Sequence, residues 1–161
     1  MTVSLATADL HDAHPDKVRR CALPLIDYGA KRLFHGPVRT VVTAEDTALA
    51  KSLFRQPGNG AVIVLDGGGS LNRALVGDIQ AGILRDNGWS GLVINGAVRD
   101  TAVLATIDLG VKALGVSFVR PRQDGIGAID VPVAFGGVLF TPGDHVYCDA
   151  DGVLVTDGPL A

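Results

Sequence analysis

Apolar residues along this chain gather into short continuous runs, separated by segments with a helical spacing. Residues 61–65 (A-V-I-V-L) form a run of strand length without a polar position, typical of a strand buried on both faces of a sheet. Further strands are predicted at residues 38–42, entered through a Gly36-Pro37 loop, at residues 91–95 and 111–116, with a short extended segment at 71–76. Helices are predicted at residues 7–12, after Glu45 and Asp46, at residues 78–87 and at residues 98–106.

This alternation of strands and helices predicts an α/β fold with parallel strand pairing. The last third of the chain differs, because its predicted strands are short and separated by G-G, P-G-D and D-A-D-G turns. They cover residues 130–134, 138–141, 146–148 and 153–156, and predict a β-rich layer that closes the fold. No repeat, charge run or linker interrupts the sequence, so residues 1–161 are expected to form a single domain.

Composition narrows the class of protein. Hydrophobic residues make up 47% and charged residues 19% of the 161 positions, as in globular proteins. The net charge of −3 gives no electrostatic footprint for nucleic acid, and no apolar run is long enough for a membrane span. The two cysteines, Cys21 and Cys148, are too few for a disulfide framework. We therefore expect a soluble cytoplasmic protein with two free thiols and with neither nucleic acid nor membrane as a partner.

Candidate chemistry is concentrated in residues 76–103. Asp78 follows a glycine, and after twenty intervening residues come the adjacent Arg99 and Asp100. A helix from Asp78, a strand and a turn at Gly96-Ala97 could return the chain to its starting point. That would place a helix N-terminus, a guanidinium and one or two carboxylates around one small space.

Each of these groups has a chemical use and a simpler explanation. The first amides of the helix at residues 77–80 could seat a carboxylate or phosphate, but Asp78 could equally be an ordinary helix cap. Arg99 could hold a carboxylate through two parallel hydrogen bonds, and Asp100 could bind a hard divalent cation. An Arg-Asp dipeptide could also be a surface ion pair. Together, at the ends of strands, the groups favour a ligand site.

Two other patterns are weaker. V-L-D-G-G-G-S at residues 64–70 resembles the first motif of adenosylmethionine-dependent methyltransferases or a loose dinucleotide loop. The G-x-G-x-x-G spacing is absent, and the extended residues 71–76 follow where a helix would be needed, which favours a tight turn forming the wall of another pocket. His11 and His14 are three apart, but Pro15 follows at once and no third ligand is near, so a surface pair is expected.

The sequence resembles the RraA-like family, on motifs that run from T-A-D-L near the N-terminus to D-G-V-L-V near the C-terminus. These are G-G-G-S-L-N-R-A-L-V-G-D, G-W-S-G-L-V-I-N-G-A-V-R-D, D-L-G-V-K-A-L-G and F-G-G-V-L-F-T-P-G-D-H-V-Y-C-D-A-D-G-V. That family contains regulators of ribonuclease activity and metal-dependent 4-hydroxy-4-methyl-2-oxoglutarate aldolases. The resemblance implies a β/β/α sandwich with a central mixed sheet and flanking helices. It also implies a homotrimer, sometimes paired into a hexamer, with sites near subunit boundaries.

The aldolase members look like D-x20-R-D-x2-(E or D), whereas the ribonuclease-inhibiting members typically lack the acids that match Asp78 and Asp100. This chain has both acids and Arg99 in register, and has Val103 at the last acidic position. The resemblance therefore implies an aldolase that cleaves 4-hydroxy-4-methyl-2-oxoglutarate, or a related 4-hydroxy-2-oxo acid, to pyruvate, with oxaloacetate decarboxylation as a side activity. The alternative is a non-enzymatic regulator that binds and inhibits a ribonuclease.

The resemblance also assigns roles. It implies Mg²⁺ or Mn²⁺ on Asp100, held mostly through water, with one supporting acid fewer because of Val103. Arg99 and Asp78 are the expected catalytic residues, although a metal-ordered water could replace Asp78 as the base. The motif contains no lysine, so a Schiff-base route has no support. The expected substrate-binding residues are Gly77, Asp78, Ile79, Gln80 and Arg99.

Overall fold

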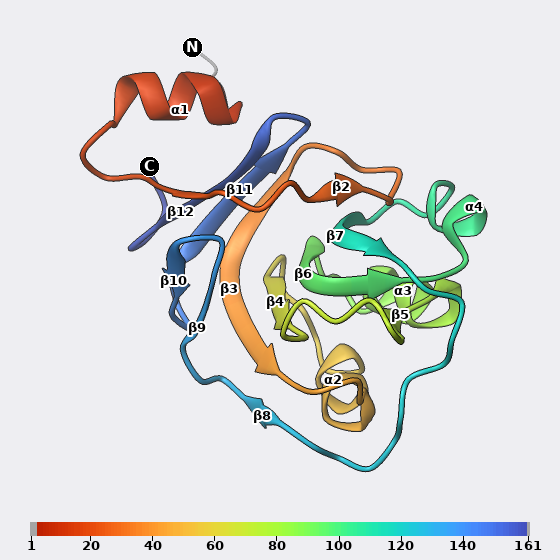
Figure 1. Cartoon of the computed structure of the whole chain (residues 1–161). Helices are drawn as coiled ribbons and strands as arrows, with labels where there is room; N and C mark the ends of the chain where they lie inside the picture. The colour runs from red at the N-terminus through yellow and green to blue at the C-terminus, as the bar shows by residue number, and fades with distance from the viewer. Residues whose placement is uncertain (1–2, 161) are drawn as a thin grey trace.

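Strand β3 (Phe34–Val42) connects two differently built halves of one large sheet. Its first half pairs antiparallel with β11 (His145–Asp149), and its second half pairs parallel with β4 (Val62–Asp66). The structure is a computed structural model that describes residues 3–160. Figure 1 shows β3 as a long curved strand that starts beside β11 and ends beside α2. The bend at β3 therefore creates two layers from a single sheet.

The other elements complete these layers. The parallel half continues from β4 through β6 (Gly91–Val98) and β7 (Gly110–Val116) to the edge strand β2 (Ile26–Asp27), with β5 (Ala74–Val76) on the end of β6. The antiparallel half continues from β11 through β12 (Gly152–Thr156) to β1 (Arg19–Cys21). Strand β8 (Ala128–Ile129) pairs with β3, and β9 (Val133–Phe135) forms a hairpin with β10 (Val138–Phe140). The helices are α1 (Thr7–Ala13), α2 (Ala48–Phe54), α3 (Asp78–Asp86) and α4 (Thr101–Leu104).

Strand β4 separates the two main hydrophobic cores. Ile63 and Leu65 point into a core shared with α2, α3 and α4, while Val62 and Val64 point into a core shared with the antiparallel strands. All four side chains are fully buried, as the apolar run predicted. The three layers are therefore an antiparallel sheet, a parallel sheet and the helices. This is the mixed α/β fold, a single β/β/α sandwich domain, that the family resemblance implied.

Helix α1 lies outside the helical layer, on the exposed face of β11 and β12 (Figure 1). Its Leu10 packs against Tyr147 and Leu154 in a third, smaller hydrophobic cluster. Among residues 3–160, even the longest helix, the nine-residue α3, is far too short to cross a bilayer.

Several predicted boundaries were wrong near glycine and proline. Gly36 and Pro37 lie within β3, at the point where the strand changes partners, so that the missing N–H of proline interrupts neither ladder. Residues 96–97 form no turn, because β6 absorbs Gly96 in an irregularity between Ile94 and Ala97 and continues to Val98. The chain turns only afterwards, so α4 is much shorter than the predicted helix at residues 98–106.

Two other boundaries shift because of backbone geometry. Glu45 has a positive φ of 56° and lies outside α2, which begins only at Ala48. Asp130 has a positive φ of 57°, and the strand predicted from it begins instead at Val133. The short strands β1, β2 and β8 were not predicted, since two or three residues carry too little periodic pattern.

The two thiols are free, as expected. Cys21 pairs with Val153, and Val153 pairs with Cys148 on its other side, so the cysteines are two strands or about 10 Å apart. That separation exceeds what a disulfide can bridge. Burial in the core between the sheets raises the pKa of both Cys21 and Cys148 above the ordinary value. They are structural residues of low reactivity.

Candidate active site at the ends of strands β5 and β6

Parallel pairing of β5 with β6 closes the twenty-residue gap between Asp78 and Arg99. Val76 lies opposite Val98, and the N–H of Arg99 donates to the carbonyl oxygen of Val76 at 3.0 Å. The residues that follow each strand therefore leave the sheet side by side. The predicted convergence is confirmed, although strand pairing rather than a turn at residues 96–97 produces it.

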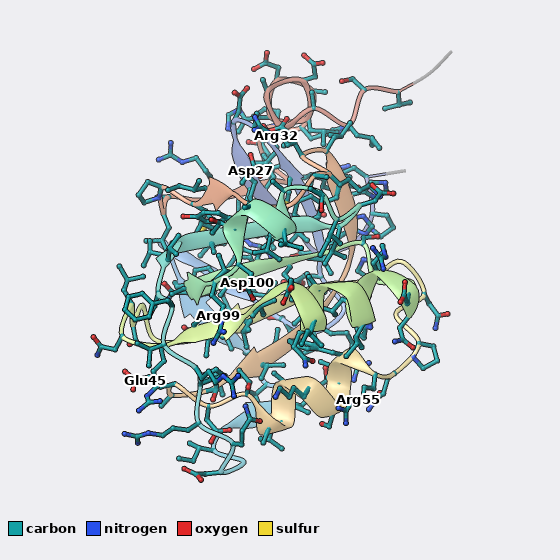
Figure 2. The ribbon with its side chains drawn as sticks, turned by 90° about the vertical axis from the view of Figure 1, so that its right-hand side faces the viewer. Asp27, Arg32, Glu45, Arg55, Arg99 and Asp100 are labelled. Carbon is teal, nitrogen blue, oxygen red and sulfur yellow. The ribbon has the colours of Figure 1, made fainter. Side chains whose placement is uncertain are left out.

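Asp100 has an unusual backbone that directs its carboxylate back toward α3. Its φ of 59° and ψ of 41° lie in the left-handed region, which is unfavourable for most residues and often marks a functional site. Its Oδ2 accepts the N–H of Asp78 at 3.2 Å and lies 3.6 Å from the Nε of Arg99. Figure 2 shows Arg99 and Asp100 next to each other. Both side chains are about one-third exposed, so a ligand can reach them.

Gly77 permits this close approach. A Cβ at this position would lie 2.5 Å from Oδ2 of Asp100 and 3.1 Å from Cγ of Arg99. The backbone of Gly77 has a φ of −128°, which other residues also adopt. A glycine is therefore required here for space and not for backbone conformation.

The start of α3 is where the sequence predicted an anion-binding element, and carboxylates of the protein itself accept two of its N–H groups. Asp78 is the first residue of the helix and Gly77 the cap, so Asp78 is not an ordinary N-cap. Oδ1 of Asp78 accepts the N–H of Ile79 at 2.8 Å, while the N–H of Asp78 is taken by Asp100. A ligand carboxylate that binds Ile79 must therefore displace the side chain of Asp78.

A cleft of about 530 Å³ opens at this junction, within the roughly 300–1,000 Å³ typical of small-molecule sites. It is lined by all the residues predicted from the motif, namely Gly77, Asp78, Ile79, Gln80, Arg99 and Asp100. The side-chain oxygen of Gln80 is buried without a hydrogen-bond donor among the described residues, which is unfavourable. The other lining groups are Ala74, Leu75, Val76 and five residues that the sequence did not indicate: Thr47, Lys51, Arg120, Pro121 and Gln123.

These five residues come from the start of α2 and from the connection between β7 and β8, which passes α2 in Figure 1. The two segments are joined by Asp46, which is 1% exposed. Burial alone would raise the pKa of this carboxyl, but N–H groups of Ala48, Asp124, Gly125 and Ile126 outweigh burial and hold the pKa below its ordinary value. No local sequence pattern links Asp46 to residues almost eighty positions away.

The glycine-rich loop after β4 helps to hold the side of the cleft that is formed by α2 and the β7–β8 connection. It does not have the form of a nucleotide site. Asp66 accepts the N–H of Gly68 and the side-chain amide of Asn95, each at 3.0 Å. The chain then enters β5 instead of a helix, so the strand–loop–helix of a phosphate-binding loop is missing. Ser70 at the end of the loop donates to Glu45 at 2.8 Å.

Glu45 links the glycine-rich loop to the residues beside the cleft. Hydrogen bonds from Ser70 and Asn72, assisted by nearby arginines, lower the pKa of Glu45. Arg73 lies 3.7 Å from Glu45 and donates to the carbonyl oxygen of Arg120 at 2.8 Å. The backbone of Arg120 is thereby fixed beside the cleft.

Comparison with known proteins agrees with this architecture. The sequence profile of RraA-like proteins, described as Aldolase/RraA, matches residues 7–155. The chain belongs to the RraA-like family. Its fold matches the RNA-processing inhibitor RraA from Thermus thermophilis, with 35% identity over 100% of this chain and 96% of that one and a TM-score of 0.94.

Two further solved structures show how varied the assigned functions of similar proteins are. One is described as an S-adenosylmethionine: 2-dimethylmenaquinone methyltransferase from Geobacillus kaustophilus HTA426, at 42% identity, 96% coverage of both chains and a TM-score of 0.95. The other is RraAS2 of Streptomyces coelicolor, an unusual member of the RNase ES inhibitor RraA protein family, at 29% identity. It covers 96% of this chain and 81% of its own, with a TM-score of 0.78. Family membership is clear, and the activity has to be argued from the site.

The donor groups of this RraA-like chain suit a hydrated hard cation. Asp100 and Asp78 have carboxylate oxygens of the kind that a hard cation binds, and no donor among residues 3–160 hydrogen-bonds to the second oxygen of Asp100. No group of three or more His, Cys, Asp or Glu side chains in this part of the chain could enclose a metal. Val103 is 46% exposed on α4 and does not line the cleft. A cation such as Mg²⁺, which needs only one or two carboxylates and keeps several waters, fits this set.

Two other hollows lack comparable chemistry. One of about 620 Å³ lies between the end of α1 and the C-terminal segment, and includes His14, Arg19 and Asp157. His14 and His11 belong to no group of three or more metal-ligating side chains among the described residues. A smaller hollow of about 260 Å³ lies beside β1. Neither combines a helix N-terminus, an arginine and a carboxylate.

Proposed function

We propose that this protein is a divalent-metal-dependent aldolase that releases pyruvate from 4-hydroxy-4-methyl-2-oxoglutarate or a related 4-hydroxy-2-oxo acid. Decarboxylation of oxaloacetate is the expected side activity. The observation that carries this proposal is the left-handed Asp100, whose carboxylate meets Arg99 and the start of α3 across Gly77. This junction brings a cation, a metal ligand and an anion-binding helix end to one cleft.

Cleavage breaks the bond between C3 and C4 of the substrate and leaves negative charge on the C2 oxygen. Arg99 can stabilise that charge more strongly as it develops, which is how a fixed cation accelerates a reaction. Bound Mg²⁺ or Mn²⁺, held by Asp100 with Asp78 nearby, would supply a Lewis acid for the same oxygen. The start of α3 binds the adjacent C1 carboxylate, through the N–H of Ile79 and its neighbours.

Asp78 is the proposed proton carrier. When the substrate carboxylate takes the N–H of Ile79, Asp78 loses its 2.8 Å hydrogen bond and its carboxylate becomes free. It then accepts the proton of the C4 hydroxyl, which allows a carbonyl to form at C4 as the C3–C4 bond breaks. Return of that proton to C3 gives pyruvate. The alternative base is a water ordered by the metal. Asp78→Asn should abolish turnover if Asp78 is the base, but not if the water is.

The second candidate is a regulator that binds and inhibits a ribonuclease. The similarity to the RNA-processing inhibitor from Thermus thermophilis and the valine at position 103 favour it. The retained Asp78 and Asp100 favour the enzyme, because a protein that acts only by binding a ribonuclease has no need for two carboxylates that meet an arginine and a helix start in one cleft. A pull-down with an RNase E-type partner, beside the pyruvate assay, separates the two.

A methyltransferase activity is not proposed, despite the description of the Geobacillus kaustophilus protein. The glycine-rich loop is followed by β5, and its carboxylate Asp66 is used in local hydrogen bonds. We expect a calorimetric titration with adenosylmethionine to give no binding. Measurable binding would reopen that alternative.

We further propose a cytoplasmic homotrimer, possible also as a dimer of trimers, as the family resemblance implies. An apolar strip supports burial by a second copy: Phe118 is 88%, Val116 52%, Leu71 48% and Val119 39% exposed. Its members come from neighbouring segments: a Cβ added at Gly115, beside Val116, would lie 3.1 Å from Leu71, and the N–H of Ala74, three residues after Leu71, donates to the carbonyl oxygen of Val119. Large exposed apolar patches usually mark interfaces. The reduced, buried cysteines are compatible with the cytoplasm.

The test of the aldolase is pyruvate release with Mg²⁺, with Mn²⁺ and with a chelator, on a panel of 4-hydroxy-2-oxo acids and oxaloacetate. Wild type should be active only with metal. Asp100→Ala should lose metal-dependent turnover, and Arg99→Lys should lose on the order of 100-fold, because a point charge does not reproduce the planar guanidinium. Full activity of Asp100→Ala, or near-wild-type turnover of Arg99→Lys, would remove that residue from the mechanism.

A further inference from the structure

The wall of the cleft built by α2 and the β7–β8 connection carries two cations without an acidic partner. Lys51 and Arg120 both line the cleft. Across residues 3–160, neither side chain comes within 4.0 Å of a carboxylate. The neighbouring Arg73 and Arg99, in contrast, lie 3.7 Å from Glu45 and 3.6 Å from Asp100. Two positive charges therefore remain available to a ligand.

The backbone that carries these cations is held in place before any ligand binds. Asp46 fixes the connection to the start of α2 through buried hydrogen bonds. Next to it, Gln123 donates to the hydroxyl of Thr47 at 2.9 Å. The carbonyl of Arg120 is held by Arg73 at 2.8 Å. Because this backbone is already ordered, binding of a ligand loses less conformational entropy.

The charges of the cleft exceed what a substrate with one carboxylate would use. Its lining contains three cations, Lys51, Arg99 and Arg120, against the carboxylates of Asp78 and Asp100. Arg99, Asp100 and the start of α3 are already assigned to the 2-oxo and C1 carboxylate groups. The remaining cations, Lys51 and Arg120, line the same cleft but come from other elements, α2 and the β7–β8 connection. They match a second anionic group on the same molecule.

We infer that Lys51 and Arg120 bind the distal carboxylate of the substrate and so select 2-oxo dicarboxylates over 2-oxo monocarboxylates. The role of this subsite in turnover rests on the proposed aldolase function, whereas dianion binding can be measured without turnover. The two residues determine specificity, since they contact the part of the substrate that is not attacked. Their removal should therefore affect dicarboxylates alone.

The kinetic test compares 4-hydroxy-2-oxoglutarate, which has a distal carboxylate, with 4-hydroxy-2-oxopentanoate, which has a methyl group there. Both release pyruvate. Lys51→Met and Arg120→Met should each lower kcat/KM for the dicarboxylate by about 10-fold or more, since hydrogen bonds between charged groups are strong, and should leave the monocarboxylate unchanged. The control is Arg55→Met, which removes an exposed cation at the C-cap of the same helix that does not line the cleft (Figure 2). It should change neither value.

The binding test titrates the Mg²⁺-loaded protein with 2-oxoglutarate and with 2-oxobutyrate. Wild type should prefer the diacid by about 10-fold or more, and both variants should lose that preference. If no acid is cleaved but the preference exists and depends on Lys51 and Arg120, the aldolase proposal fails and the subsite stands. If pyruvate is released and the variants discriminate as well as wild type, the subsite fails and the aldolase stands. If neither acid binds, the subsite fails, and the aldolase is then judged by pyruvate release alone.

Discussion

At the scale of single residues, Gly77 decides how near Asp100 can come to the start of α3. The first prediction is that Gly77→Ala lowers kcat/KM for pyruvate release on the order of 10- to 100-fold, because the new methyl group overlaps Oδ2 of Asp100 and displaces its carboxylate. Stability should change little, since alanine can adopt the backbone of Gly77 and the atom it meets ends a flexible side chain. Steady-state kinetics beside thermal unfolding measure both effects.

The matched control for this variant is Gly82→Ala, in the same helix. A Cβ there meets only the end of Arg85 at 3.8 Å, an ordinary contact. This variant should keep full activity and stabilise the protein by about 1 kcal/mol, because alanine favours a helix interior. Equal activity of both variants would mean that the close approach of Asp100 to Gly77 has no catalytic importance.

The key residues of the site were visible in the sequence because they lie in two short segments around glycines and strand ends. Asp78, Arg99 and Asp100 could be selected by their spacing together with the resemblance to the RraA-like family, whereas residue type alone allowed helix caps and a surface ion pair. Lys51 and Arg120 could not, since they reach the cleft through tertiary hydrogen bonds of Asp46 and Arg73. The capture of the N–H of Asp78 by the carboxylate of Asp100 was also invisible, because it depends on the left-handed backbone of Asp100.

At the scale of elements, the sequence predicted best where burial follows a regular period. Strand β4 and helix α3 were predicted nearly to their ends, because β4 is apolar up to its last residue, Asp66, and α3 begins with an acid directly after a glycine. The misplaced turn at residues 96–97 has a different cause. A glycine in a strand can signal a turn or a bulge, and only the pairing of β6 with β7 decides between them.

The connection between β7 and β8 depends on the buried carboxylate of Asp46. Asp46→Asn should destabilise the protein by roughly 2–3 kcal/mol near neutral pH, because an amide replaces a buried carboxylate that accepts several N–H groups. Activity toward dicarboxylates should fall with it, since Arg120 belongs to the same connection. Urea unfolding at fixed protein concentration measures the loss.

The pH dependence of this variant provides a separate check. The folded pKa of Asp46 lies below its ordinary value of 3.8, so its stabilisation is fully present above that value and is lost as the pH falls through the folded pKa. The stability difference between wild type and Asp46→Asn should therefore shrink on acidification below pH 3.8. A difference that stays constant with pH would show that the ionised carboxylate does not anchor the connection.

At the scale of the whole molecule, the three layers determine which surface remains for an active site. Strands β4 and β6 are covered on both faces, by the antiparallel strands and by the helices. A ligand can therefore reach the parallel half only at the ends of its strands, and the cleft lies where β5 and β6 end. This follows from packing alone, so the fold supports the position of the site independently of the motif that first indicated it.

The last prediction addresses assembly. The strip of Leu71, Val116, Phe118 and Val119 continues directly into Arg120 of the cleft wall, so a second copy bound there would also border the active site. Wild type should sediment as a trimer, or as a multiple of it, at micromolar concentration. Phe118→Asp should weaken association by about 100-fold or more, because each contact would bury an unpaired carboxylate. The control is Leu139→Asp, which introduces a charge at another apolar position, 51% exposed, on β10.

A monomeric wild type would contradict the trimer. An unchanged mass for Phe118→Asp would show that the interface lies elsewhere than this strip. If the variant dissociates and its dicarboxylate turnover falls while Leu139→Asp keeps both properties, the cleft depends on a neighbouring copy.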